Sequence, residues 1–177
     1  MKPIFLSLLV FTIFSCKAQE KQNDIVLQPE VVNYTYETVA SDIAIPWGMT
    51  WLPDGSMLVT EKSGIIYHVK NKAKTEITNV PKVVARGQGG LLDIAVHPNY
   101  TQNGWIYITY SSNEGLEKGA NTQLIRAKLE RTSLTQIQTL YKATPNTTLG
   151  HHFGSRIAFD NEGFVYFTVG DRGNHPE

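Results

Sequence analysis

Cysteine is almost absent from this chain of 177 residues: Cys16 is the only one, and it ends an apolar N-terminal stretch. A disulfide within the chain is therefore excluded, and so is a cysteine-based zinc site of the usual spacing. The folded part must be held together by core packing and strand pairing, without covalent cross-links.

Net charge is absent as well, because 16 Lys and Arg residues balance 16 Asp and Glu residues. No basic cluster longer than a pair occurs, which argues against a nucleic-acid-binding surface. This neutrality is compatible with a small uncharged substrate or with a protein partner, and it does not choose between them.

The N-terminus has the pattern of an export signal, with Lys2 followed by an apolar stretch, Ile4 to Phe14, that is too short to cross a bilayer. We assign residues 1–18 to a signal peptide and residues 19–33 to a polar tether. Cys16 follows a small residue, as in a bacterial lipoprotein signal, and ordinary cleavage after Ala18 is the alternative. The protein is therefore expected to be exported by a bacterium, either as a periplasmic protein or as a lipoprotein anchored to the outer membrane.

Three stretches of the chain repeat one pattern: an alternating apolar run, a turn rich in Pro, Asp, Asn and Gly, and a β-branched or aromatic run ending near threonine. They cover residues 49–69, 92–112 and 155–173, and their turn glycines are Gly55, Gly104 and Gly163. The pairs Asp54-Gly55 and Glu162-Gly163 predict tight hairpins, because glycine accepts positive φ, whereas residues 97–104 predict a longer loop. The turn glycines are 49 and 59 residues apart, so each unit has the length of a propeller blade.

The sequence therefore predicts an all-β fold, with a β-propeller favoured over a β-sandwich. About three blades are expected, and no sustained helical periodicity follows the signal. Propellers close with about four to eight blades, so we expect this chain to be the N-terminal portion of a longer protein. A self-associating half propeller and a truncated reading frame are the alternatives. The isolated chain is expected to be poorly soluble.

Two glycine-rich segments, Ala85 to Pro98 and Leu149 to Arg156, lie just before the first strand of a repeat. Equivalent loops of successive blades gather on one face of a propeller, so Gln88 and the pair His151-His152 are expected to belong to one site. The first segment is not a dinucleotide loop, because Leu92 replaces the third glycine and no helix follows. It is either a flexible turn or a loop that presents the Gln88 amide to a ligand.

Adjacent side chains of an extended chain point to opposite faces, so only one histidine of the pair is expected to face the site. Zinc spacing and a nucleophile elbow are absent, as are the paired carboxylates of a glycoside hydrolase. A lone general base and a packing or surface role remain equally open for this histidine.

Other candidate residues are expected to be structural. These are His68 and His97, together with the aromatic residues Trp47, Trp51 and Trp105, which are expected in the core. Asp171 and Arg172 follow a predicted strand and are either turn residues or contacts at the rim of the site.

Three segments, taken in this order, resemble the soluble glucose/sorbosone dehydrogenases, which are aldose sugar dehydrogenases dependent on pyrroloquinoline quinone (PQQ). They are IPWGMTWLPDGSMLVTEKSGIIYHV, GQGGLLDIAVHPNY and GHHFGSRIAFDNEGFVYFTVGDRG, and the resemblance covers the chain from about Val39 to its end. The resemblance implies that residues 34–177 are the N-terminal part of a six-bladed propeller domain, with about three blades present.

This resemblance also implies a function: oxidation of the C1 hydroxyl of an aldose to the lactone, by hydride transfer to PQQ. His152 would be the general base and would also contact the quinone, Gln88 would contact the quinone, and His151 and Gln88 would border the sugar pocket. Calcium would polarise the accepting carbonyl, with its ligands expected beyond this chain, so no metal ligands are assigned here and the chain alone is expected to be inactive. An external electron acceptor is implied, and contact with a membrane only through a lipid anchor. The alternative is a non-catalytic propeller lipoprotein that binds glycans or a protein.

Overall fold

The computed structural model describes residues 33–173. The predicted signal peptide, the Cys16 lipidation site and almost all of the predicted tether lie outside the described residues. The chain divides into two units, residues 1–36 and 37–177. Of the first unit, residues 33–36 are described, and they are exposed and in neither helix nor strand.

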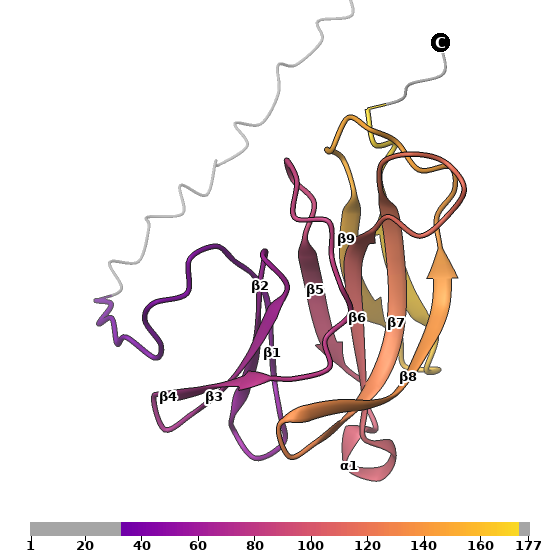
Figure 1. Ribbon diagram of the computed structural model, residues 1–177. Coiled ribbons are helices and arrows are strands. Elements are labelled where there is room, and N and C mark those ends of the chain that lie inside the picture. Colours follow the sequence, from indigo (N-terminus) through magenta and orange to yellow (C-terminus); the bar gives the residue numbers. More distant parts are fainter. Residues whose placement is uncertain (1–32, 174–177) are drawn as a thin grey trace, which may run out of the picture. The chain divides into compact units, whose positions relative to one another are not determined.

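Residues 37–173 form antiparallel strands in three sheets (Figure 1). The first sheet contains β1 (Pro46–Trp51), β2 (Met57–Glu61), β3 (Ile65–Lys70) and β4 (Ala73–Ile77), in chain order. The second contains β5 (Leu91–Val96), β6 (Trp105–Ser112), β7 (Asn121–Glu130) and β8 (Ser133–Lys142), also in chain order. The third pairs β9 (Gly154–Phe159) with β10 (Val165–Val169). Each four-stranded meander is one blade and contains one of the sequence repeats. The third repeat, called the third unit below, is represented by its first two strands, β9 and β10.

The turn predictions are confirmed at both short hairpins. Gly55 and Gly163 have φ values of 79° and 90° and lie between β1 and β2 and between β9 and β10, respectively. The longer second loop contains a single helical turn, α1 (Tyr100–Asn103), which ends where Gly104 adopts φ 68° and donates its N–H to the Tyr100 carbonyl. No helix in the described part of the chain is long and apolar enough to cross a membrane.

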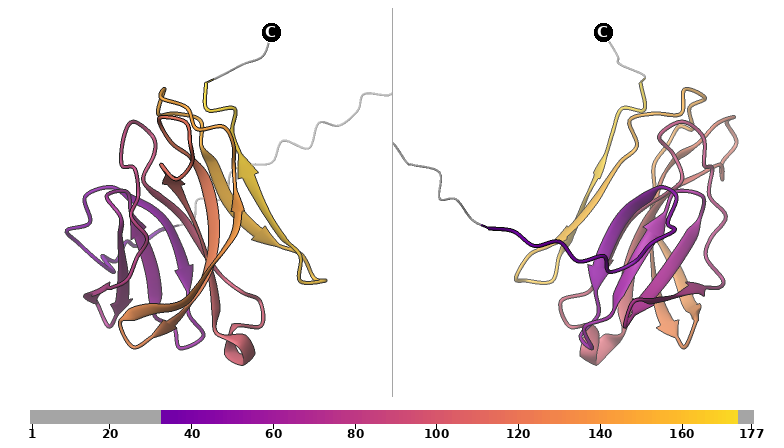
Figure 2. Two further views of the ribbon diagram at one scale, coloured as in Figure 1. Left: turned by 45° about the vertical axis from the view of Figure 1, so that its right-hand side comes forward. Right: turned by 90° about the vertical axis from the view of Figure 1, so that its left-hand side faces the viewer.

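The three sheets follow one another face to face, as Figure 2 shows. Between the first two, Leu58 and Ile66 pack with Ile94 and Ile108 in one fully buried apolar cluster. Between the second and third, a smaller cluster contains Tyr107, Leu124 and Ile157. The contacts of β1 with β5 and of β5 with β9 place the first strands of the units next to one another.

A buried threonine hydroxyl joins each four-stranded sheet to the next sheet. Thr60 Oγ1 accepts the N–H of Gly48 in its own blade at 2.9 Å and donates to the Leu92 carbonyl of the next blade at 2.6 Å. Thr109 Oγ1 repeats this arrangement with the Asp93 N–H and the Ser155 carbonyl, both at 3.0 Å.

Each of these hydroxyls accepts a backbone N–H at a point where the strand pairing is irregular. The pairing of β1 with β2 and of β5 with β6 shifts register at Gly48 and Asp93, where the ladder leaves an N–H without a strand partner. The threonine that ends each of the first two β-branched runs satisfies that N–H and links it to the neighbouring sheet. The sequence repeat thus marks a repeated inter-blade contact.

The expected core positions of the tryptophans are wrong in two of three cases. Trp47 and Trp51 are 42% and 53% exposed, and Met49 between them is 56% exposed. Alternate residues of a strand share a face, and Gly48 and Thr50 occupy the face of β1 that packs on β5. Met49 and Trp51 therefore lie on the opposite, more open face, whereas Trp47 lies within the register shift of β1 and its Nε1 donates to the Ser155 hydroxyl of the third sheet at 3.4 Å.

We predict that Thr109→Val lowers the free energy of unfolding by about 2 kcal/mol, because this isosteric change leaves a buried N–H and a buried carbonyl without partners. Thr168→Val is the matched control, since Thr168 ends the third repeat but is exposed, and its cost should stay within about 0.5 kcal/mol. Urea denaturation measures both. Equal losses for the two variants would contradict the inter-blade role of the hydroxyl.

Candidate functional site

The two glycine-rich loops, which the chain places in successive blades, meet through Gln88. Its backbone N–H donates to the Gly150 carbonyl at 2.8 Å, and its side-chain Oε1 accepts the N–H of His152 at 2.8 Å. Gly87 makes this approach possible: with φ 58°, a Cβ there would lie 2.2 Å from the Gly150 carbonyl oxygen. The structure therefore brings together Gln88 and His152, the two residues that the sequence assigned to one site.

The segment after β10 holds His152 from the other side. The His152 Nδ1 lies 2.8 Å from Asp171 Oδ1, and the Arg172 N–H donates to the His152 carbonyl at 3.2 Å. Gly170 packs against that carbonyl so closely that a Cβ would lie 2.0 Å from its oxygen. The backbone and ring of His152 are thus fixed by two different parts of the chain, while 49% of its side chain is exposed.

The expectation that the two histidine side chains face opposite ways is wrong. Their ring centroids are 4.5 Å apart, and the rings are tilted by 72° in an edge-to-face contact. The expectation assumed an extended chain, but His152 has φ 56°, the left-handed conformation. This kink turns the two rings toward each other, with His151 half-buried and packed against Gly173.

Asp171 is the residue of the site whose role sequence reasoning left open. It was expected at a turn or at the rim, and it is both: Oδ1 accepts the Gly173 N–H at 2.8 Å as well as facing His152. The available signal was its position, because it directly follows the second strand of the third unit, at the end where the glycine-rich loops lie. A carboxylate on Nδ1 fixes the ring orientation and the tautomer, which leaves Nε2 as the nitrogen that can accept a proton.

An ion pair between a buried carboxylate and an exposed guanidinium lies where β9 leaves this site. Asp93 is 2% exposed and accepts Nη1 of Arg156 and the N–H of Ile157, both at 2.8 Å. The Arg156 side chain is 68% exposed, so its guanidinium is held at one edge and open to solvent at the others. A positive group is therefore fixed four residues beyond His152.

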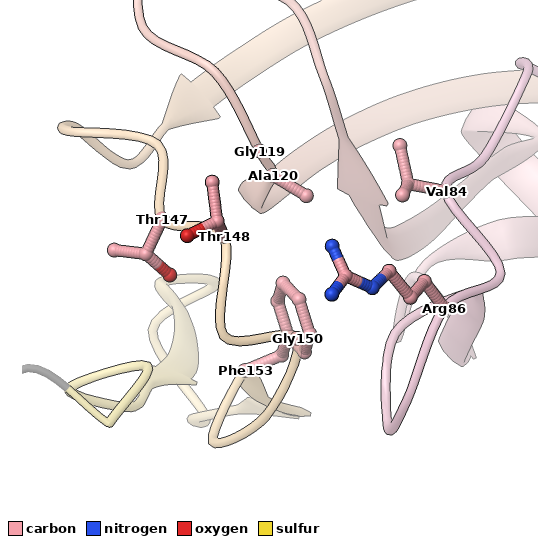
Figure 3. Close-up of a pocket in the computed structure, with 8 residues that line it drawn as sticks. All are labelled: Val84, Arg86, Gly119, Ala120, Thr147, Thr148, Gly150 and Phe153. Carbon is pink, nitrogen blue, oxygen red and sulfur yellow. The ribbon is translucent and has the colours of Figure 1, made fainter.

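A small pocket of about 50 Å³ lies beside residues 149–153, called the histidine loop below (Figure 3). Its lining comes from the loops that precede β5, β7 and β9: Val84, Arg86, Gly119, Ala120, Thr147, Thr148, Gly150 and Phe153. Phe153 is buried, and its carbonyl accepts the hydroxyl of Thr122 at 2.6 Å. The loop is therefore anchored at Phe153 and borders a void next to Gly150.

His68 and His97 have structural contacts, as expected. His68 Nε2 lies 2.8 Å from the Ser56 hydroxyl, and His97 Nδ1 accepts the Asn99 N–H at 3.0 Å. Within residues 33–173, no group of three or more His, Cys, Asp and Glu side chains is arranged to hold a metal ion. The expected calcium site remains a prediction.

The chain matches the family described as Glucose / Sorbosone dehydrogenase over residues 43–177. It is 31% identical over 153 residues to the aldose sugar dehydrogenase of Escherichia coli, covering 84% of this chain and 40% of the relative. It is also 26% identical over 155 residues to the human Hedgehog-interacting protein, covering 78% of this chain and 22% of that protein. The chain thus spans two fifths or less of the length of these relatives.

Solved structures agree with this assignment. The apo-form of the soluble E. coli enzyme superposes with a TM-score of 0.73 at 31% identity, covering 77% of this chain and 41% of that one. The PQQ-bound aldose sugar dehydrogenase of Streptomyces coelicolor superposes with a TM-score of 0.66 at 29% identity, covering 78% and 41%. The predicted all-β fold of the sugar dehydrogenase propeller type is confirmed.

We predict that Gly87→Ala destabilises the protein by about 1–3 kcal/mol more than Gly163→Ala does. Both glycines have positive φ, so both variants carry the backbone strain of a left-handed alanine. Only at Gly87 does the new Cβ also overlap a backbone carbonyl, whereas at Gly163 nothing lies within 4 Å. Thermal unfolding of the two variants measures the difference, and equal midpoints would contradict the close contact between the loops.

Proposed function

Because this chain belongs to the glucose/sorbosone dehydrogenase family, we propose that it contributes the catalytic base to an aldose sugar dehydrogenase. The reaction is oxidation of the C1 hydroxyl of an aldose to the lactone, with PQQ as the hydride acceptor. The observation that carries the proposal is the pairing of His152 with Asp171 at 2.8 Å on the face where the loops of two blades meet.

In this proposal His152 removes the proton of the sugar's C1 hydroxyl. With Nδ1 held by the Asp171 carboxylate, Nε2 accepts the proton, and the carboxylate stabilises the imidazolium that forms. Proton removal raises the electron density on the sugar oxygen and so favours departure of the C1 hydride. The contacts of the His152 carbonyl and N–H keep the ring in place through this step.

The donor groups of this site fit part of a quinone site. PQQ carries carbonyl and carboxylate oxygens, which need N–H donors and positive charge. The Nε2 of Gln88 is a donor whose direction is fixed, because Oε1 accepts the His152 N–H, and the open edges of Arg156 offer further donors. When bound, the quinone would supply the hydride acceptor, and calcium would polarise its carbonyl through ligands outside the described residues.

The surroundings of the reaction are part of the same proposal. The substrate is a neutral aldose, an external acceptor reoxidises the quinone, and no nucleic acid takes part. We propose that residues 1–18 direct export, that Cys16 or cleavage after Ala18 sets the mature N-terminus, and that residues 19–33 act as a tether. His151 borders the sugar pocket, where its ring packs on that of His152.

A second candidate function is a non-catalytic propeller that binds a glycan or a protein. It is favoured by the similarity to the human Hedgehog-interacting protein, whose name describes an interaction rather than an oxidation. The two functions differ in one requirement, since only the enzyme needs a base whose ring is oriented by a carboxylate.

We predict that His152→Ala abolishes dye-linked aldose oxidation by the full-length protein that contains this chain, supplied with PQQ and calcium, while PQQ binding stays within a few-fold of that of the unmodified protein. Loss of a general base costs about 10²–10⁴-fold in turnover. His151→Ala is the matched control and should lower kcat by less than about tenfold. No oxidation of any aldose by the unmodified protein, together with no PQQ binding, would favour the non-catalytic function.

We predict that Asp171→Asn lowers kcat by about 10²-fold and leaves KM for the sugar nearly unchanged. Asparagine keeps the size of the side chain but removes the charge that fixes the tautomer of His152 and stabilises its protonated form. Steady-state kinetics with saturating PQQ measures both constants. An unchanged kcat would show that Asp171 serves only the turn that ends at Gly173.

A further inference from the structure

We propose that Gln88 is a positioning residue, which holds His152 in its left-handed conformation and so aims the imidazole at the substrate. This role is additional to any contact that Gln88 makes with a ligand. The catalytic part of the inference rests on the proposed function, whereas its structural part does not.

Gln88 contacts the histidine loop at two points, on either side of His151. Its backbone N–H donates to the carbonyl of Gly150, and its side-chain oxygen accepts the N–H of His152, both at 2.8 Å. A single residue of the second blade therefore fixes both ends of the peptide segment that carries the adjacent rings. Because a backbone N–H can only donate, the carboxamide must turn its oxygen toward His152.

His152 needs such a restraint because its backbone is strained. A φ of 56° costs a residue with a Cβ about 1–2 kcal/mol relative to the right-handed region, and such conformations persist only where surrounding contacts hold them. Gly150, two residues before His152, also has positive φ, 79°, and borders the pocket, whereas the buried Phe153 anchors the loop just after the kink. The kink between these points is restrained by the hydrogen bonds of Gln88 to Gly150 and His152, together with the Arg172 N–H on the His152 carbonyl.

Gln88 is itself rigidly placed by the second blade. Gly90 donates its N–H to the Ser111 hydroxyl at 2.7 Å, and its carbonyl accepts the Ser111 N–H at 2.9 Å. A Cβ on Gly89 would lie 2.8 Å from the same hydroxyl, so the turn after Gln88 is pressed against β6. The position of the base in the third unit is thus set by the second blade.

The carboxamide can carry two roles at once. Its oxygen accepts the His152 N–H, and this contact fixes the direction in which the Nε2 donors point. A methionine at this position would keep the length of the side chain but lose the acceptor. A glutamate would keep an acceptor oxygen and lose the Nε2 donors. These two variants separate positioning from ligand contact.

The test combines amide hydrogen exchange at His152, followed by NMR, with kinetics of the protein supplied with PQQ and calcium. Gln88→Met is expected to speed exchange of the His152 amide about tenfold or more, because its acceptor is gone. It is also expected to lower kcat by about 10–100-fold with KM for the sugar nearly unchanged, since a base displaced by about 1 Å loses up to about 10²-fold in rate. Gln88→Glu should restore slow exchange, because it keeps an acceptor oxygen, and any remaining loss of activity in this variant reports the separate loss of the Nε2 donors.

Gln138→Met is the matched control, because Gln138 Oε1 also accepts a side-chain N–H, from Arg126 at 2.8 Å, on the exposed outer part of the second blade. It should change neither readout. Unchanged exchange of the His152 amide in Gln88→Met would overturn the proposal, and so would exchange in Gln88→Glu as fast as that in Gln88→Met. If the unmodified protein oxidises no sugar, the proposed function fails, and the exchange measurement alone still decides whether Gln88 holds His152.

Discussion

The hydroxyl of Thr109 links two sheets at the point where the regular ladder of the second blade is interrupted. It satisfies the N–H of Asp93 within the blade and donates to the carbonyl of Ser155 in the next unit. The Asp93 carboxylate adds its contacts with Arg156 and Ile157 at the same junction. Since no disulfide is available, these buried polar contacts and the apolar clusters around them fix how one blade sits on the next.

The geometry of the site follows from that junction. Ser155 lies three residues after His152, so the contact that places β9 against β5 also carries the histidine loop to the loop before β5. Because Gly87 has no side chain, the two backbones can approach closely. The side chain of Gln88 completes the contact by accepting the His152 N–H. The base is therefore positioned by the packing of whole blades rather than by its own loop, which suits a residue that has to keep its orientation while it exchanges a proton.

Much of this arrangement could be predicted from the sequence. The recurring runs that end in threonine gave the hairpins and the blade repeat, and the equivalent positions of Gln88 and His152 placed them in one site. What the sequence could not predict is conformation that depends on partners distant in the chain. The left-handed backbone of His152 is held by Gln88 and by the Arg172 N–H, and no local preference of histidine requires it.

The same limit explains why the role of Asp171 stayed open. Its pairing with His152 requires the segment after β10 to fold back over the histidine loop, and Gly170 permits this because a side chain there would overlap the His152 carbonyl. The spacing of residues along the sequence does not predict that this segment folds back over the histidine loop. The exposure of Trp51 has a similar origin, because the choice of which face of β1 is covered is made by β5.

The central claim is that the loops of the second and third units form one quinone-binding face. The most direct measurement is a titration of the protein with PQQ and calcium, followed by the backbone amide shifts of the described residues. We expect the largest amide shifts at Gln88 and His152 and in residues 170–173. Shifts confined to the opposite ends of the blades, around Gly55, Gly104 and Gly163, or no saturable shifts at all, would contradict it.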